Sequence, residues 1–222
     1  MVVLATRIYV TGEARQRALD SLDSLVADAV GELDVEWTVG LRDDEFPSVT
    51  VEGSDAAAAR NVLAEQWGQV SHPLSDEGVG TLEAWDEEGF VLDAGYDQRV
   101  RVPADGLGLG PGSPSQVRTR FGLVQHLPLR FTVEDGVARL ADAERDRLFD
   151  WTRGDGRVNV NSATRSEVRA TVNRAGHAED IVTVERLGLL EQSIVCREGT
   201  DPPGLLSSIG TYLPSELLCV VP

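Results

Sequence analysis

Lysine is absent from this sequence, and arginine supplies every basic side chain. The 20 arginines face 37 aspartates and glutamates, which gives a formal net charge of -17. Such a surface repels itself, but at molar salt the Debye length is about 3 Å and the repulsion is screened. The acidic residues are interspersed with 41% hydrophobic residues, whereas an acidic disordered tail would carry blocks of like charge. The composition therefore predicts a globular protein adapted to molar salt, as in salt-accumulating halophiles.

Cysteine and long apolar runs are also scarce. Cys196 and Cys219 are the only cysteines, and they are too few and too far apart for a disulfide framework. No stretch approaches the roughly 18 apolar residues of a membrane helix. The opening MVVLATRIYV has neither the basic start nor the long apolar run of a secretory signal. We therefore expect a cytoplasmic protein without a membrane partner.

The motifs of common enzyme and metal sites are missing as well. His72, His126 and His177 lie in separate segments, without the HxH or HExxH spacing of a metal site. The glycine-rich stretch 106–112 has no lysine for a phosphate-binding P-loop, and it does not lie in the βαβ unit of a dinucleotide fold. No GxSxG element marks a nucleophilic serine. We expect no catalytic residue, no cofactor and no metal, and we interpret 106–112 as a structural loop.

Two parts of the chain predict a similar succession of strands and helices. Residues 1–73 predict a βαββα unit, with strands at 2–10, 34–41 and 47–53 and helices at 13–33 and 56–67. Residues 142–222 predict a linker helix at 142–154 and then a βαββαβ unit, with strands at 157–161, 180–188, 191–196 and 216–222. Its two helices are expected at 163–176, capped by Ser162, and after Thr200-Asp201. Both orders are those of a ferredoxin-like half-sandwich, so the predicted fold class is α+β.

The segment between them, residues 74–141, has a different pattern. Short strands with a single late helix are typical of a small five-stranded barrel. Three stretches, Val79–Leu82, Glu88–Gly95 and Val100–Pro103, resemble the opening strand, the turn-strand and the third strand of S1-class OB-fold RNA-binding domains. This resemblance implies an OB barrel whose face stacks bases. Val91 stands where S1 domains carry an aromatic residue and Arg101 where they carry a histidine; arginine also stacks on bases and binds phosphates.

The whole chain is similar to an archaeal domain-of-unknown-function family, number 2110. The segments that carry this resemblance are VLATRIYV, RFGLVQHLPLRF, VNVNSATRSEV and REGTDPPGLLSSIG. The resemblance implies an archaeal origin, of the haloarchaeal type given the acidic composition. It implies no activity.

Because arginine is the only cation of the chain, the places where it accumulates indicate where an anion would bind. From Arg153 to Arg174, five arginines stand against two acidic residues. We expect a nucleic-acid-binding surface on the barrel, its helix and the C-terminal unit, made of Arg99, Arg101, Arg118, Arg120, Arg157, Arg165, Arg169 and Arg174. The alternative is that these arginines pair with neighbouring acids, and composition alone does not separate the two.

These observations predict a non-enzymatic RNA-binding protein of the translation, RNA-processing or transcription machinery. Its partner would be an RNA, ribosomal or nascent, or a ribonucleoprotein or transcription complex. The alternative is a protein-interaction module that docks through strand edges or apolar faces without nucleic acid. The stretch VNVNSATRSEV also resembles the start of a helix-hairpin-helix DNA-binding unit, but the second glycine and second helix of that motif are missing.

Overall fold

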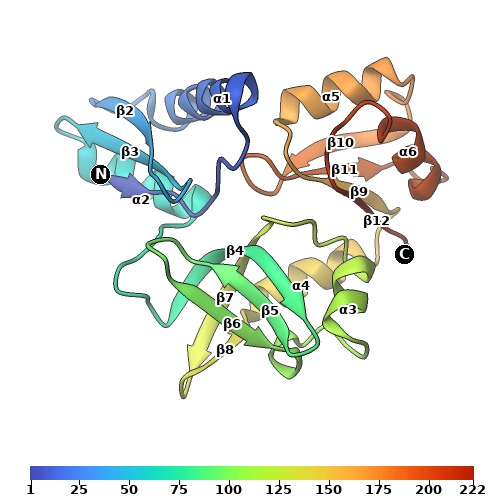
Figure 1. The fold of residues 1–222 in the computed structure, drawn as a ribbon. Coiled ribbons are helices and arrows are strands. Elements are labelled where there is room, and N and C mark those ends of the chain that lie inside the picture. The colour runs from blue at the N-terminus through green and yellow to red at the C-terminus, as the bar shows by residue number, and fades with distance from the viewer.

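The computed structural model describes all residues, 1–222. Three sheets with their helices surround a common junction (Figure 1). The α+β class predicted from the sequence is confirmed. None of the helices is both long and apolar enough to cross a membrane.

The N-terminal module is a three-stranded antiparallel sheet with two helices. Its strands follow the order β1 (Val2–Val3), β3 (Pro47–Glu52) and β2 (Glu36–Leu41). Helices α1 (Gly12–Val30) and α2 (Ala56–Trp67) bury residues four positions apart, which places one apolar stripe of each helix on the module core. An isolated antiparallel bridge between Leu4 and Gln69 continues the sheet beyond β1.

The expected first strand is much shorter than its pattern indicates. Only Val2 and Val3 pair in the sheet, and residues 4–10, which we call the crossing segment, leave it and run through the junction. Leu4 still donates to Pro47 at the start of β3, but further along the segment Ile8 donates to Glu45 in the β2–β3 turn. A continuous apolar run is typical both of a buried strand and of an irregular segment buried on all sides, so the sequence does not distinguish the two.

The central module is a five-stranded antiparallel sheet in the order β6-β5-β4-β7-β8. Its strands are β4 (Glu77–Asp86), β5 (Gly89–Asp93), β6 (Arg99–Pro103), β7 (Pro128–Glu134) and β8 (Val137–Leu140). The 3-10 turn η1 (Ala104–Leu107) and helix α3 (Pro114–Arg120) connect β6 to β7. The edge strands β6 and β8 approach one another without a ladder between them, so the predicted barrel is not closed.

Helix α4 (Asp142–Trp151), expected as a linker, packs onto the central module. Leu148 and Trp151 lie in the same apolar cluster as Phe90 and Phe131. The buried carboxylate of Glu144 reaches the side chain of Arg130 on β7. By its packing, α4 is therefore part of the central core.

The C-terminal module is a four-stranded antiparallel sheet in the order β10-β11-β9-β12. Its elements are β9 (Arg157–Val160), α5 (Arg165–Arg174), β10 (Ile181–Arg186), β11 (Gln192–Cys196), α6 (Pro202–Ile209) and β12 (Leu217–Val220). The cap of α5 differs from the expectation, because Thr164 and not Ser162 is the N-cap and forms a capping box with Glu167. Ser162 instead has a left-handed φ of 59° and donates its backbone N–H to the Tyr9 hydroxyl.

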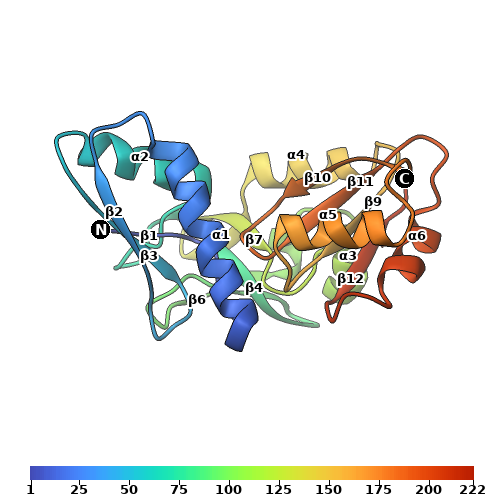
Figure 2. The same cartoon turned by 90° about the horizontal axis from the view of Figure 1, so that it is seen from above.

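The three modules share apolar residues, so they are not independent domains with separate cores. Val220 of β12 belongs to the core of the central module. Leu189 and Leu190, which follow β10, belong to the core of the N-terminal module. One end of α5 approaches α1 (Figure 2), and Arg17 on α1 pairs with Glu167 in the first turn of α5 at 2.8 Å. Each module therefore completes its neighbours.

Candidate functional site

The two barrel arginines predicted to bind RNA are paired with carboxylates. Arg101 makes two hydrogen bonds to Asp86, at 2.9 and 3.0 Å, across the β4–β5 hairpin. These contacts hold the pKa of Asp86 below its ordinary value. Arg99 lies 2.6 Å from the buried Asp93. Both guanidinium groups therefore already have an anion, as the ion-pair alternative anticipated.

The two arginines of α3 make contacts within the protein and not with solvent anions. Arg118 is buried, pairs with Glu216 from the C-terminal module and lies 3.7 Å from the ring centroid of Trp85. Arg120 donates to the carbonyls of Pro111 and Leu109, at 2.8 and 2.6 Å. Arg120 thus fastens the glycine-rich loop, which has the structural role predicted for it.

The arginines of the C-terminal module are in two situations. Arg157 pairs with Glu185 at 3.0 Å and lies over the Trp151 ring, and burial lowers its pKa. Arg165 donates to the Val184 carbonyl at 2.6 Å. Arg169 and Arg174 point to solvent, and Arg174 lies over the Tyr212 ring at 5.2 Å. These last two arginines have no carboxylate partner.

A shallow groove runs between α5 and the free edge of β10. It has a volume of about 160 Å³, and we call it the α5–β10 groove. Its lining consists of Arg169, Asn173, Ala178, Ile181, Val182, Thr183, Val184 and Arg197. No carboxylate lines the groove, although the chain is strongly acidic. Of the predicted surface, this is the part that remains open to an anion.

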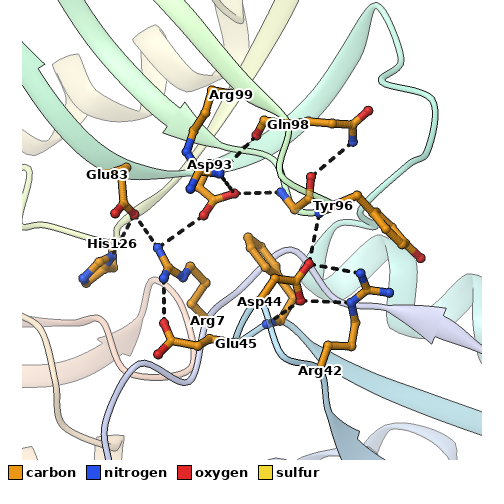
Figure 3. Close-up of polar contacts among 12 residues, drawn as sticks. Arg7, Arg42, Asp44, Glu45, Glu83, Asp93, Tyr96, Gln98, Arg99 and His126 are labelled. Atoms are coloured by element: carbon orange, nitrogen blue, oxygen red, sulfur yellow. Dashed lines mark hydrogen bonds and ion pairs between the residues drawn. The ribbon is translucent and has the colours of Figure 1, made fainter.

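A polar network that no sequence pattern indicates lies between the N-terminal and central modules (Figure 3). Arg7 of the crossing segment lies at its centre and contacts three carboxylates: Glu45 at 2.6 Å, Asp93 at 3.4 Å, and Glu83. The carboxylates come from the β2–β3 turn, from β4 and from β5. Burial raises the pKa of Asp93, and its contacts with the Gly95 N–H, Arg99 and Arg7 oppose that shift.

A second part of the network fixes the β5–β6 turn to the N-terminal module. Asp44 accepts from Arg42 at 3.0 Å and from the Tyr96 backbone N–H at 3.0 Å (Figure 3). The Arg42 guanidinium lies 3.8 Å from the Tyr96 ring centroid. These contacts lower the pKa of Asp44 and stabilise its ionised form. The turn is therefore held by charge, hydrogen bonds and stacking together.

A buried acid connects the N-terminal and C-terminal modules. The Tyr9 hydroxyl donates to Glu191 at 2.7 Å, and the Tyr9 ring stacks on His126 of the central module with 3.9 Å between centroids. Burial raises the pKa of Glu191 to about 8, so that its neutral form is favoured at neutral pH. Burial also lowers the pKa of His126, which favours the neutral imidazole. Three modules thus meet around one aromatic residue.

Backbone strain is concentrated in the same region. Glu45, Tyr96, Asp97, His126 and Ser162 are non-glycine residues with φ between 52° and 67°. Such conformations are costly for L-residues and persist where the surroundings over-determine them. Glu45, His126 and Ser162 contact Arg7 or Tyr9 directly. Strain of this kind often marks functional sites, and no sequence pattern revealed it.

Comparison with known proteins follows the same three modules. Residues 1–73, 75–152 and 155–221 match the N-terminal, central and C-terminal domains of DUF2110. The chain belongs to the DUF2110 family. No curated protein and no solved structure matches it. The DUF2110 central domain includes α4, which agrees with the packing of α4 onto the central core.

In this DUF2110 protein a polar pocket lies where the three modules meet. We call it the junction pocket; its volume is about 310 Å³. Residues from all three modules line it, including Trp67, Arg130, Arg147 and Arg186. No group of three or more histidine, cysteine, aspartate or glutamate side chains is arranged to hold a metal. Three arginines line the pocket against two glutamates, so the charged lining is net positive and suits an anion.

Proposed function

We propose that this protein binds RNA without catalysis, in the translation, RNA-processing or transcription machinery, and that the α5–β10 groove is its contact surface. The observation that carries the proposal is that Arg169 and Arg197 line a groove to which no carboxylate contributes, although Arg197 also lines a neighbouring acidic pocket. In a chain with a net charge of -17, a cationic groove without acids is exceptional and suits a phosphate backbone.

The chemistry of the groove and its surroundings suits RNA in two ways. Arg169 and Arg197 supply charged donors, and Asn173 supplies an amide for sugar or base edges. Tyr212, 49% exposed and next to Arg174, offers a face on which a base can stack. Because counterion release contributes little at molar salt, hydrogen bonds and stacking would carry the affinity.

The proposal also concerns the fold type of each of the three modules. We infer that the outer modules are ferredoxin-like units and that the central module is an S1-like OB barrel. The strand order β12-β9-β11-β10, and the order β1-β3-β2 extended by the Leu4–Gln69 bridge, support the first inference. The order β6-β5-β4-β7-β8, with a helix between β6 and β7, supports the second.

Filter binding of total RNA at molar KCl tests the proposal. The double variant R169Q/R174Q removes two exposed arginines from the α5 surface, and R60Q/R139Q removes the same charge from α2 and β8. We expect the α5 variant to lose about tenfold or more in affinity and the control to bind like the unchanged protein. Retention of RNA no better than that of a charge-matched acidic protein would falsify the proposal.

A second candidate function rests on the free edge of β10. This strand pairs with β11 on one side only, and Val182 is 62% exposed on it. An extended peptide could add to such an edge. Pulldowns from lysate with and without RNase separate the candidates, because partners that survive RNase favour protein docking and partners lost with RNase favour RNA.

A further inference from the structure

The junction pocket is built from all three modules of the chain. Trp67 comes from the end of α2, Arg130 from β7, Arg147 from α4 and Arg186 from the end of β10. Its volume of about 310 Å³ is at the small end of the range for ligand pockets. A space of this size accepts a molecule no larger than a nucleotide.

Arg186 is the unusual residue of this pocket, because its guanidinium has no counter-ion. Its side chain makes no hydrogen bond and no ion pair within 4 Å, and its guanidinium carbon lies 5.8 Å from the centroid of the Trp67 ring. Burial and the charge of Arg165 lower the pKa of Arg186, and the charge of Asp28, which is not in ion-pair contact, opposes that shift. A partly buried cation without a partner is costly, and an anion in the pocket would remove that cost.

Trp67 provides a second donor without a partner. Its side chain lines the pocket and is only 7% exposed, and its indole Nε1 is buried without a hydrogen-bond acceptor. Buried polar groups in folded proteins are satisfied in the great majority of cases. The same pocket thus holds a partly exposed cation without an ion pair, Arg186, and a buried donor without an acceptor, Trp67 Nε1; together they indicate a missing anionic acceptor.

The acid of the pocket does not supply that acceptor. Glu144 gives one carboxylate oxygen to Arg147 and the other to the side chain and backbone N–H of Arg130. Both carboxylate oxygens of Glu144 are therefore already engaged by Arg147 and Arg130, and neither accepts from Arg186 or Trp67. Glu65, the other acid in the lining, is exposed to solvent.

We propose that the junction pocket binds a small oxyanion, a phosphate or a carboxylate on a compact organic molecule, with Arg186 as its counter-ion and Trp67 Nε1 as a hydrogen-bond donor. Arg147 and Arg130 share the single charge of Glu144 and so add one net positive charge to the wall. Val79 and Pro128 offer apolar surface to the body of the ligand. Because every module contributes to the wall, the bound anion also fastens the modules to one another. The site is independent of the α5–β10 groove, whose lining residues it does not share.

Titration of the full chain with inorganic phosphate, AMP and acetate in molar KCl tests this assignment. The readout is the indole N–H resonance of Trp67, identified by its loss in the variant W67F. We expect at least one of the three probes to shift that resonance saturably. Tighter binding of AMP than of phosphate identifies a nucleotide source, and preference for acetate identifies a carboxylate.

Variants make the assignment specific to the pocket. Arg186→Gln should weaken binding of the effective probe by about 10- to 100-fold, the range expected for loss of a charged hydrogen bond. Arg139→Gln, on the exposed face of β8, removes the same charge outside the pocket and should leave affinity unchanged. W67F should weaken binding in calorimetry, because phenylalanine keeps an aromatic ring but lacks the indole N–H donor. If no probe shifts Trp67, or if R186Q and R139Q bind alike, the assignment is overturned, whereas RNA binding through the α5–β10 groove would be unaffected.

Discussion

At the scale of single residues, the arginines divide according to what surrounds them. Arg101, Arg118 and Arg157 each have a carboxylate within reach, whereas Arg169 and Arg186 have none. All five look alike in the sequence, since the acids that neutralise the first three lie on other strands or in other modules. Whether an arginine is free to bind an external anion therefore depends on the folded structure and not on its local sequence.

Glu191 gives a prediction at this scale. Its folded-state pKa of about 8 lies above the ordinary value of 4.5, so the unfolded chain loses this proton at a lower pH than the folded chain does. The free energy of unfolding should therefore fall by a few kcal/mol as pH rises from about 4.5 to about 8. Glu191→Gln keeps an acceptor for Tyr9 but cannot ionise, and it should flatten this part of the profile.

Denaturant unfolding at a series of pH values in molar KCl measures the effect. The matched control is Glu198→Gln, which removes an exposed carboxylate of the same module. A profile that keeps the same slope in E191Q as in the unchanged protein would show that Glu191 does not cause it.

At the scale of elements, the helices and strands follow their patterns closely, and the exceptions lie at the junction. The helix expected at 163–176 is α5, and Gly176 follows its end with a φ of 82°. The crossing segment and the Ser162 cap are the errors, because their hydrogen bonds go to residues distant in the sequence: Ile8 donates to Glu45, and Ser162 donates to Tyr9 of another module. The local hydrophobic pattern predicts helices and strands, but it does not indicate which residue far along the chain will supply a hydrogen-bond partner.

The tie between α3 and β12 gives a prediction at this scale. Arg118, with 8% of its side chain exposed, depends on Glu216, which also accepts from the Gln125 backbone N–H at 2.7 Å. Glu216→Ala leaves Arg118 buried without a partner and should cost about 3 kcal/mol of unfolding free energy. The exposed pair Arg153–Asp150 is the control, and Asp150→Ala should cost less than about 1 kcal/mol. Equal costs in denaturant unfolding would contradict the buried role of Arg118.

At the scale of the whole molecule, the shared cores and the net charge act in opposite directions. Val220, Leu189 and Leu190 tie the modules together by burial, whereas a charge of -17 pushes them apart. Ion pairs such as Arg7 with Glu45 and Arg17 with Glu167 bridge or buttress the junctions. The balance between these forces depends on how far each charge is screened.

The last prediction follows from that balance. When KCl is lowered from about 1 M to about 0.1 M, the Debye length rises from about 3 to about 10 Å, and repulsion reaches between modules. We expect the protein to unfold on dilution of salt, and to do so in one transition, because each module needs its neighbours to complete its core. Circular dichroism follows the loss of secondary structure. Tryptophan fluorescence follows single modules in two single-tryptophan variants, one that retains Trp37 in the N-terminal module and one that retains Trp85 in the central module. Coincident midpoints support an interlocked molecule, separate midpoints contradict it, and full stability at low salt contradicts the halophilic interpretation of the lysine-free surface.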